Sequence, residues 1–377
     1  MEFHDRLKTS SAKGIVSDYQ RQQKKKNAAE DLKTVLWKKH ASFFTMWREI
    51  RMLSKGRGAL NGQEYVRYQL YRRDMPQSAK EEFLTDRLHW PICDLLSSPY
   101  WRAVTEDKWI CYTLLEAAGI PIPRTVAVFD PTLRSYGKTL TLRTSDDVRE
   151  FLEQDHNYPL FVKPCDQLGS FGAFIITGAA DGKALLHDGS AATPGELLAD
   201  YFGTEPFLLQ ATLHNHRDLS DLTGRLATVR LVNLVRGNTI ETPFAAFKIP
   251  AGDNIADNFW RAGNLLADVD PATGVIRRIV RGTGLEQEVV EKGRGLQLPY
   301  WEEVLAINTA VSRLFPKIAY NSLDIAITQD GPVVVEVNSG GSFDLMQVAS
   351  GKGFLTPSVT AFFQEHGWPK RNKPSRR

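Results

Sequence analysis

The sequence contains few cysteines and no long apolar segment. Its 377 residues include three cysteines, which are Cys93, Cys111 and Cys165. A disulfide framework or a zinc site requires closely spaced ligands, so this spacing excludes both and indicates reduced thiols. No run of about 18 apolar residues occurs, and the first residues lack the apolar segment of a signal peptide. These absences predict a cytoplasmic protein.

Charge is distributed unevenly along the chain. The formal net charge is +3, but residues 1–60 hold 14 Lys and Arg against 6 Asp and Glu, so the remainder is slightly acidic. Such a basic segment is suited to nucleic acid or to an anionic membrane, and a weak membrane contact is one alternative. Apolar residues spaced by three, four and seven between Leu32 and Leu53 instead favour a helix that packs on the protein body. We therefore do not expect nucleic-acid binding, and the oligomeric state is left open.

Composition and periodicity divide the chain into segments. The polar, lysine-rich start is expected to be flexible, and helical spacings follow, beginning with one helix over residues 28–54 that ends before Gly56. The segments are a basic flexible arm (1–27), an N-terminal helical region (28–98), a first α/β part (99–206), a C-terminal part (207–367) and a basic tail (368–377).

Antiparallel hairpins dominate the second half of the chain. Polarity alternates over residues 226–235, and Arg236-Gly237-Asn238 predicts a turn into a second strand over 239–248. Strands over 322–328 and 333–337 flank another turn, and a long amphipathic helix precedes them. Hairpins with interspersed helices predict an α+β fold rather than a doubly wound parallel sheet.

The last hairpin contains the sharpest functional signal. Glu336 and Asn338 lie two residues apart in a Val-rich strand, so they share one face of the sheet. If the neighbouring strand is antiparallel, Asp324 faces this pair and three oxygen ligands converge. Mg²⁺ prefers one or two carboxylates together with phosphates and water, so these residues predict a Mg²⁺ site completed by ATP, with Mn²⁺ as an alternative ion. The alternative role for Glu336 is an ion pair with an arginine.

A lysine and a glycine-rich loop follow each other in the first α/β part. Lys163 ends a buried strand, where its ammonium can meet a phosphate. Backbone N–H groups of Gly169, Ser170 and Gly172 can approach the same anion. No Walker sequence occurs, and a plain hairpin turn is the alternative interpretation of the loop.

Together, these features resemble the ATP-grasp superfamily. The order is Lys108 on a helix, Lys163 on a strand, the glycine-rich loop and the Asp324, Glu336 and Asn338 set. The sequence is most similar to the sugar-transfer-associated ATP-grasp branch, related to α-L-glutamate ligases, over about residues 60–356. The resemblance implies an ATP-grasp fold, in which two α+β lobes grip ATP, with an N-terminal helical extension. The other shared segments are Thr228-Val229-Arg230, Asp257-Asn258-Phe259, Gly263, Asp268-Val269-Asp270 and Phe343-Asp344-Leu345.

The resemblance also implies roles for individual residues. Lys108 and Lys163 are expected to hold the α- and β-phosphates of ATP, and the glycine-rich loop is expected to close on them. The hinge between the lobes is expected to bind adenine through the backbone of Gln210, Ala211 and Leu213. This hinge lacks the acidic residue that many ATP-grasp proteins carry. The candidates to replace it are His214, His216 and Asp218.

Arg230 is the candidate that points to the reaction. It lies mid-strand on the same face as Thr228, and its planar guanidinium is suited to clamp the γ-phosphate or an acyl-phosphate made from it. The alternative is a surface arginine lying along the sheet. Lys248 is expected to assist Arg230, whose role we expect to be catalytic rather than stabilising.

These features predict an ATP-dependent carboxylate–amine ligase that acts on small molecules through an acyl-phosphate. The alternatives are a kinase acting on a hydroxyl group and a non-catalytic ATP-binding protein.

Overall fold

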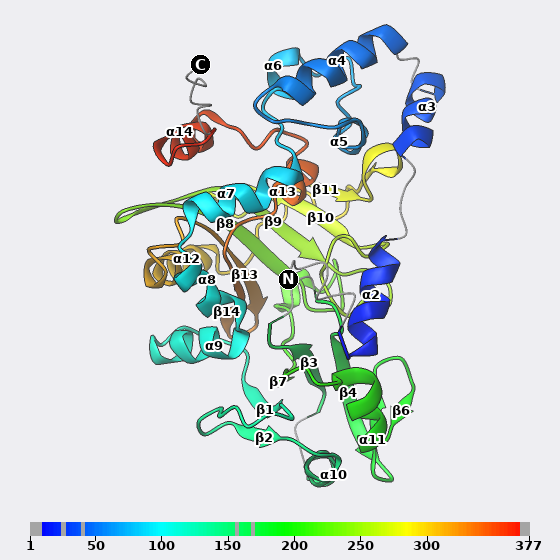
Figure 1. The fold of residues 1–377 in the computed structure, drawn as a ribbon, viewed down its shortest axis with the longest axis vertical. Helices are drawn as coiled ribbons and strands as arrows, with labels where there is room; N and C mark the ends of the chain where they lie inside the picture. Colours follow the sequence, from blue (N-terminus) through cyan, green and yellow to red (C-terminus); the bar gives the residue numbers. More distant parts are fainter. Residues whose placement is uncertain (1–9, 24–27, 39–41, 155–157, 167–169, 370–377) are drawn as a thin grey trace, which may run out of the picture.

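The computed structural model describes residues 10–23, 28–38, 42–154, 158–166 and 170–369. Two sheets lie one beyond the other along the long axis, and helices α3 to α6 form the end next to the second sheet (Figure 1). No helix among these residues has the length and apolarity to span a bilayer. The mixed helices and mainly antiparallel strands confirm the predicted α+β class.

The first sheet forms the lobe at the lower end of Figure 1, and we call it the first lobe. Its strand order is β2-β1-β7-β3-β4-β5-β6, in which β1 and β2 are parallel and the other neighbours antiparallel. Phe129 and Phe202 stack at 4.3 Å between ring centroids in its core. The strands are β1 Thr125–Phe129, β2 Leu140–Leu142, β3 Leu160–Pro164, β4 Phe174–Ala180, β5 Lys183–Leu186, β6 Ala191–Ala192 and β7 Phe207–Ala211.

The boundary between the lobes differs from the prediction. Strand β7 pairs with β1 on one side and with β3 on the other, so it belongs to the first sheet. The division between residues 206 and 207 therefore lies one strand too early. Both pairings join residues distant in sequence, and local periodicity carries no information about such pairings.

The second sheet is antiparallel throughout its order β12-β11-β10-β9-β8-β13-β14 and forms the second lobe. Helix α12 covers one face with Val304 and Val311, and α13 covers the other with Phe343 and Met346. The predicted hairpin of β8 and β9 is confirmed. The strands are β8 Thr228–Arg236, β9 Thr239–Ile249, β10 Leu265–Val269, β11 Ile276–Arg281, β12 Glu288–Val289, β13 Tyr320–Thr328 and β14 Gly331–Asn338.

The helices connect the sheets and build the upper end of the molecule (Figure 1). A threonine capping box starts α10, since Thr144 and Asp147 satisfy each other's backbone N–H groups. The helices are α2 Lys13–Gln23, α3 Ala28–Lys38, α4 Phe43–Lys55, α5 Gly62–Arg67, α6 Gln77–Lys80, α7 His89–Leu96, α8 Pro99–Glu106, α9 Lys108–Ala117, α10 Ser145–Glu153, α11 Pro194–Glu196, α12 Trp301–Leu314, α13 Phe343–Ser350 and α14 Pro357–Glu365.

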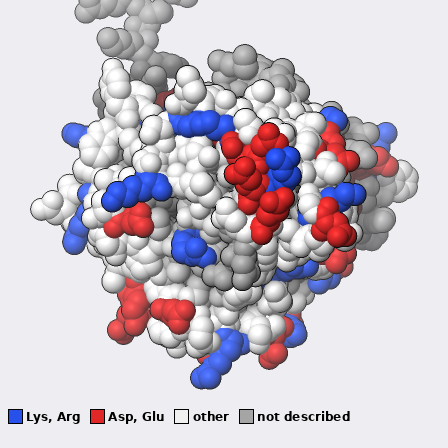
Figure 2. All heavy atoms as spheres, turned by 90° about the horizontal axis from the view of Figure 1, so that it is seen from below, with Lys and Arg blue, Asp and Glu red and all other residues white. Residues whose placement is uncertain are grey.

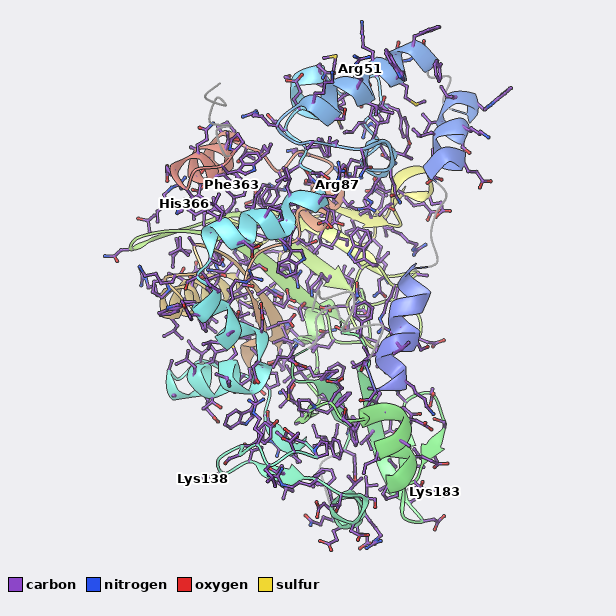
Figure 3. All side chains as sticks on the ribbon, in the orientation of Figure 1. Arg51, Arg87, Lys138, Lys183, Phe363 and His366 are labelled. Carbon is purple, nitrogen blue, oxygen red and sulfur yellow. The ribbon has the colours of Figure 1, made fainter. Side chains whose placement is uncertain are left out.

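The helical region departs from the prediction at both of its ends. The expected single helix over residues 28–54 is two helices, α3 and α4, and Trp47 on α4 is 52% exposed rather than packed. At the other end, Trp368 is buried against Phe363, so the start of the predicted basic tail belongs to the fold. Phe363 lies on α14, in the upper part of the molecule (Figure 3). Residues 370–377 of the tail lie outside the described residues.

The predicted flexible arm is wrong for residues 10–23. Ala12 and Ile15 are fully buried in the core of the first lobe. The Ser11 hydroxyl accepts a hydrogen bond from the backbone N–H of Thr204 at 2.7 Å. Two apolar side chains thus dock a segment whose overall polarity predicted disorder. The rest of the arm lies outside the described residues.

We expect Ile15→Ala to lower the free energy of unfolding by about 2–5 kcal/mol, because it opens a cavity in a closely packed contact. A β-carbon built on Gly172 would lie 2.4 Å from Ile15 Cγ1, which shows how tightly the helix fits. Denaturant unfolding measures the change, and Val16→Ala, at a half-buried neighbouring position, is the control. Unchanged stability in Ile15→Ala would show that α2 is not docked in solution.

Charged side chains of both signs lie next to each other on the surface of the lower end (Figure 2). No broad area of that face carries basic residues alone.

Candidate active site

A cleft of about 720 Å³ lies between the two sheets and is lined by both lobes. Lys163 on β3 and Gln210 on β7 line it from the first lobe. Arg230, Asp324 and Glu336 line it from the second lobe, on three adjacent strands. Most of the residues predicted to form a site therefore converge on one cavity.

Strand register aligns the central residues in one row. Arg230 on β8 is paired with Asp324 on β13, which in turn is paired with Glu336 on β14. Asn338 follows two positions later on the same strand, opposite Ser322. The predicted antiparallel hairpin is confirmed, and it brings Asp324, Glu336 and Asn338 together.

Asp324 is the centre of an ion-pair network. Arg230 donates to its two oxygens from Nε at 2.7 Å and from a terminal nitrogen at 2.6 Å, and Lys248 Nζ lies 2.9 Å from Oδ2. Burial raises the pKa of Asp324, but the charges of Arg230 and Lys248 outweigh burial and hold that pKa below its usual range. The carboxylate is therefore ionised, and it fixes both cations at the cleft wall.

Asp257 completes this network, and sequence reasoning assigned it no role. Its carboxylate lies 3.1 Å from Lys248 Nζ and also accepts a hydrogen bond from the Thr228 hydroxyl. Lys248 therefore bridges two carboxylates that come from different segments. The shared Asp257-Asn258-Phe259 segment was the only available signal, and it did not specify a partner.

The second-lobe residues fit a cation completed by phosphate. An Asp324 carboxylate offers about four lone-pair sites, and the three hydrogen bonds from Arg230 and Lys248 leave room for one ligand bond. Within the described residues, no three His, Cys, Asp or Glu side chains are grouped to hold a metal ion by themselves. A Mg²⁺ ion here would thus need phosphate oxygens as further ligands, as is usual for this ion.

Asn338 provides an independent sign of a missing polar partner. Its amide nitrogen is buried and makes no hydrogen bond within the described part of the chain. Rotation of an amide exchanges its oxygen and nitrogen, so Asn338 can offer an oxygen to a cation or an N–H to a phosphate. Metal ligation by Asp324, Glu336 and Asn338 remains a prediction that this geometry supports.

Both predicted phosphate-binding lysines line the cleft. Lys108 is the first residue of α9, and its Nζ lies 3.4 Å from a carboxylate oxygen of Glu336. Lys163 Nζ donates to the Tyr112 hydroxyl at 2.7 Å and lies 3.4 Å from the Val335 carbonyl oxygen. Burial, followed by the charge of Lys108, lowers the pKa of Lys163 to about 8. Lys163 has no anionic hydrogen-bond partner among these contacts, which suits it to an incoming phosphate.

We expect ATP affinity to fall as the pH rises above about 8, the pKa of Lys163 in the unliganded protein. The charged lysine binds phosphate and the neutral form does not, so deprotonation weakens binding; bound phosphate moves the midpoint upward. Lys163→Ala should weaken ATP binding by about 2–3 kcal/mol and remove this pH dependence. Isothermal titration calorimetry across pH 7–10 is the measurement.

The control for this experiment is Lys183→Ala, because Lys183 is exposed and lies at the lower end of the first lobe (Figure 3). It should bind ATP like the wild type. Identical affinity and pH dependence in Lys163→Ala and the wild type would remove Lys163 from the phosphate site.

The glycine-rich loop is partly described. Ser170 and Gly172 have positive φ angles of 58° and 71°, and Gly169 lies outside the described residues. The Gly172 N–H donates to the Asp18 carboxylate of α2 at 3.1 Å, and Arg261 links that carboxylate to the Ser170 carbonyl oxygen. A backbone donor predicted to face phosphate thus binds a carboxylate in this structure. The Gly172 N–H is therefore already engaged, and of these two residues only Ser170 lines the cleft.

The hinge lines the cleft, but part of its backbone is already engaged. The Ala211 N–H donates to the Arg124 carbonyl oxygen at 3.0 Å, and the Gln210 side chain donates to Thr125 Oγ1 at 3.2 Å. Ala211 is therefore not positioned to donate to adenine through its N–H. Leu213 also lines the cleft and keeps its predicted role.

One of the candidates for the missing acidic residue lines the cleft. His214 does so, whereas His216 and Asp218 are not among the lining residues. His216 is buried, and its Nδ1 accepts a hydrogen bond from the backbone N–H of Asp218 at 3.2 Å. His216 therefore caps the short 3₁₀ turn over Arg217–Leu219. His214 is therefore the candidate that the geometry favours.

Comparisons with known proteins identify the family of the chain. The chain matches the family model described as sugar-transfer associated ATP-grasp over residues 96–362, which begins later than the predicted extent of about 60–356 and ends close to it. No curated protein matches it. The similar solved structures include D-alanyl-alanine synthetase A from Vibrio cholerae O1 biovar eltor, with 14% identity, a TM-score of 0.44, and coverage of 72% of this chain and 67% of that chain.

Two further solved structures extend this comparison. D-alanine–D-alanine ligase from Bacillus anthracis has 12% identity and a TM-score of 0.37, covering 72% of this chain and 67% of that one. N5-carboxyaminoimidazole ribonucleotide synthetase from Thermotoga maritima has 14% identity and a TM-score of 0.35, covering 65% of this chain and 44% of that one. The family match, which spans well over half of the sequence, shows that the chain belongs to the sugar-transfer-associated ATP-grasp family.

Proposed function

We propose that the protein is an ATP-dependent carboxylate–amine ligase that acts through an acyl-phosphate. Membership of an ATP-grasp family supports ATP-dependent ligase chemistry in general. The proposal of a carboxylate–amine ligase rests on one observation. Four cationic side chains line the same cleft as Glu336 and Asn338, whose side-chain oxygens can bind a cation. The cations are Lys108, Lys163, Arg230 and Lys248, and we call this part of the cleft the phosphate end.

Each residue of the phosphate end has a role that follows from its contacts. Lys108 and Lys163 bind the phosphates of ATP, and Glu336 with Asn338 would hold Mg²⁺, which neutralises charge on the transferred phosphoryl group. Arg230 is oriented by its two-pronged contact with Asp324. Its remaining terminal nitrogen makes no hydrogen bond within the described residues and is available to an acyl-phosphate oxygen.

Hydroxylamine trapping tests this proposal. The full chain is incubated with Mg-ATP, hydroxylamine and a panel of amino acids and other small carboxylic acids. Hydroxylamine attacks an acyl-phosphate, so a ligase yields a hydroxamate and releases ADP and phosphate in equal amounts. Omission of the acid should abolish both products.

The same experiment identifies the alternatives. A kinase yields ADP and a phosphorylated alcohol without free phosphate or hydroxamate when sugars and alcohols replace the acids. A non-catalytic ATP-binding protein binds Mg-ATP in calorimetry and yields no product with any acceptor. Either result would overturn the ligase proposal.

A further inference from the structure

The cleft extends beyond the phosphate end to the N-terminal helical region, for which the sequence indicated no catalytic role. Asp86, His89 and Trp90 line this extension from a short 3₁₀ turn and the start of α7. Trp260 lines it from the β9–β10 connection. Helix α7 thus contributes directly to the cavity that holds the proposed reaction.

This extension is next to the row of reacting groups. Gly340 follows Asn338 by two residues, and its backbone N–H donates to the Asn338 carbonyl oxygen at 2.9 Å. A β-carbon at Gly340 would lie 2.5 Å from Cys93 Sγ and 3.3 Å from His89 Cε1. The absence of a side chain at this position therefore lets α7 pack directly on the loop that leaves β14.

The extension has the opposite charge to the phosphate end. Asp86 makes no side-chain hydrogen bond or ion pair within the described residues and faces the cleft. Asp344 lies 3.3 Å from Arg67, and the Glu64 carboxylate accepts a hydrogen bond from the Asp86 backbone N–H at 3.0 Å. Asp344 is thus paired with Arg67, whereas the Glu64 carboxylate is bound by Asn61, Thr85 and Asp86. We call the part of the cleft lined by Asp86, Trp90 and Trp260, with Asp344 buried behind it, the acidic end.

Two buried polar groups at the acidic end lack partners. The Tyr68 hydroxyl and His89 Nδ1 are buried and make no hydrogen bond within the described part of the chain. His89 lines the cleft, whereas Tyr68 is only 5% exposed and lies behind the lining. Burial, together with the charge of Asp344, raises the pKa of Tyr68. Unsatisfied buried polar groups are rare, and they commonly mark a place where a ligand or water binds.

We propose that the acidic end binds the protonated amine substrate and that Asp86 removes its proton. The assignment rests on the proposed ligase function. The negative charge attracts an ammonium. Trp90 and Trp260 carry the guanidinium groups of Arg102 and Arg67 on one face each, and the rings add aromatic walls for the organic substituent of the amine. The phosphate end sets four cations against the carboxylates of Asp257, Asp324 and Glu336, so it keeps a net positive charge and is less suited to the same ligand.

The proton and electron balance of the coupling step is complete with these groups. The ammonium transfers one proton to the Asp86 carboxylate and becomes a neutral amine. Its nitrogen forms a bond to the acyl carbon, and the carbon–oxygen bond to phosphate breaks with the electron pair left on phosphate. The released phosphate takes the second nitrogen proton, so the products are an amide, hydrogen phosphate and protonated Asp86.

The surroundings of Asp86 favour it over His89 as the base. The charge of Asp344, together with burial and Glu64, raises the pKa of Asp86 to about 7, although Arg67 opposes them. Burial lowers the pKa of His89 to about 4, with Arg230 acting in the same direction and Asp344 against it. A base whose pKa lies near the working pH is the more effective one.

Asp86→Asn tests the acidic end with two kinds of nucleophile. Hydroxylamine is mostly neutral near pH 7 and needs no base, so hydroxamate formation should stay within about twofold of the wild type. With protonated amines (glycine, both alanine enantiomers and ethanolamine as probes), amide formation should fall by about tenfold or more, with a raised KM for the amine. Asp86→Glu should restore part of the activity, and amide formation by the wild type should decline as the pH falls below about 7.

Asp74→Asn is the matched control, since Asp74 lies in the same helical region, is exposed and is paired with Arg72 outside the cleft. It should behave as the wild type with both nucleophiles. Equal amine kinetics in Asp86→Asn and the wild type, or an equal loss with both nucleophiles, would overturn the acidic-end assignment while leaving the ligase proposal intact. A wild-type protein that forms no hydroxamate from any acid would overturn the ligase function itself and the assignment with it.

Discussion

Replacing Glu336 by Gln is expected to lower ATP turnover by about a hundredfold to a thousandfold without unfolding the protein. Gln keeps the shape of the side chain but removes the charge that would bind Mg²⁺ and balance Lys108. Folding should survive because the ion pair between Glu336 and Lys108 is long, at 3.4 Å, and because the Glu336 side chain is 19% exposed. The Val-rich strand around it is unaffected by the change.

ADP release in a coupled assay measures turnover, and thermal unfolding checks the fold. Glu288→Gln is the matched control, because Glu288 lies on β12 at the opposite edge of the same sheet and its side chain is 67% exposed. Titration with Mg²⁺ should show a weaker metal dependence in Glu336→Gln alone. Normal turnover with an unchanged Mg²⁺ requirement would reduce Glu336 to a structural residue.

Replacing Asp324 by Ala is expected to destabilise the protein by about 3–5 kcal/mol, since it leaves buried cations without their partner. Arg230 and Lys248 both contact this carboxylate, which is 4% exposed. Denaturant unfolding measures the change. Activity should also be lost, because Arg230 would no longer be held toward the cleft.

The same network revises the expectation that Arg230 has no role in stability. Arg230→Ala removes the two-pronged contact from a buried carboxylate, so we expect a stability loss as well as a loss of turnover. Arg230→Lys should restore neither fully, because an ammonium cannot make both contacts. A double-mutant cycle of Asp324→Ala and Arg230→Ala should give a coupling energy of about 1–3 kcal/mol. Strictly additive effects would show that the two side chains do not interact in solution.

The sequence by itself determined the features that depend on neighbouring residues. The alternation of β14 put Glu336 and Asn338 on one face, and the turn over 329–331 predicted the antiparallel partner that carries Asp324. The Thr144 capping box and Gly119, with a φ angle of 72°, lie at helix ends and are signals of the same local kind. These signals are local, because backbone period and turn chemistry are set by adjacent residues.

The tertiary structure decided the contacts between distant segments. It placed β7 between β1 and β3, and it paired Lys248 with Asp257 as well as Asp324. It also docked α2 on the first lobe, although the polar composition of that segment predicted disorder. In each case the stabilising partner lies far away in the chain, so no local pattern encodes it.

The same reason explains why the two ends of the cleft were not equally visible in the sequence. Lys163, Arg230, Asp324, Glu336 and Asn338 lie on strands with a clear period, and these residues are recognisable by type and order. The acidic end is assembled from Asp86 and Trp90 near the N-terminus, Trp260 in a loop and Asp344 near the C-terminus. These side chains come together when the helical region packs on the second lobe. Burial of apolar surface is not directional, so this packing leaves no periodic pattern in the sequence.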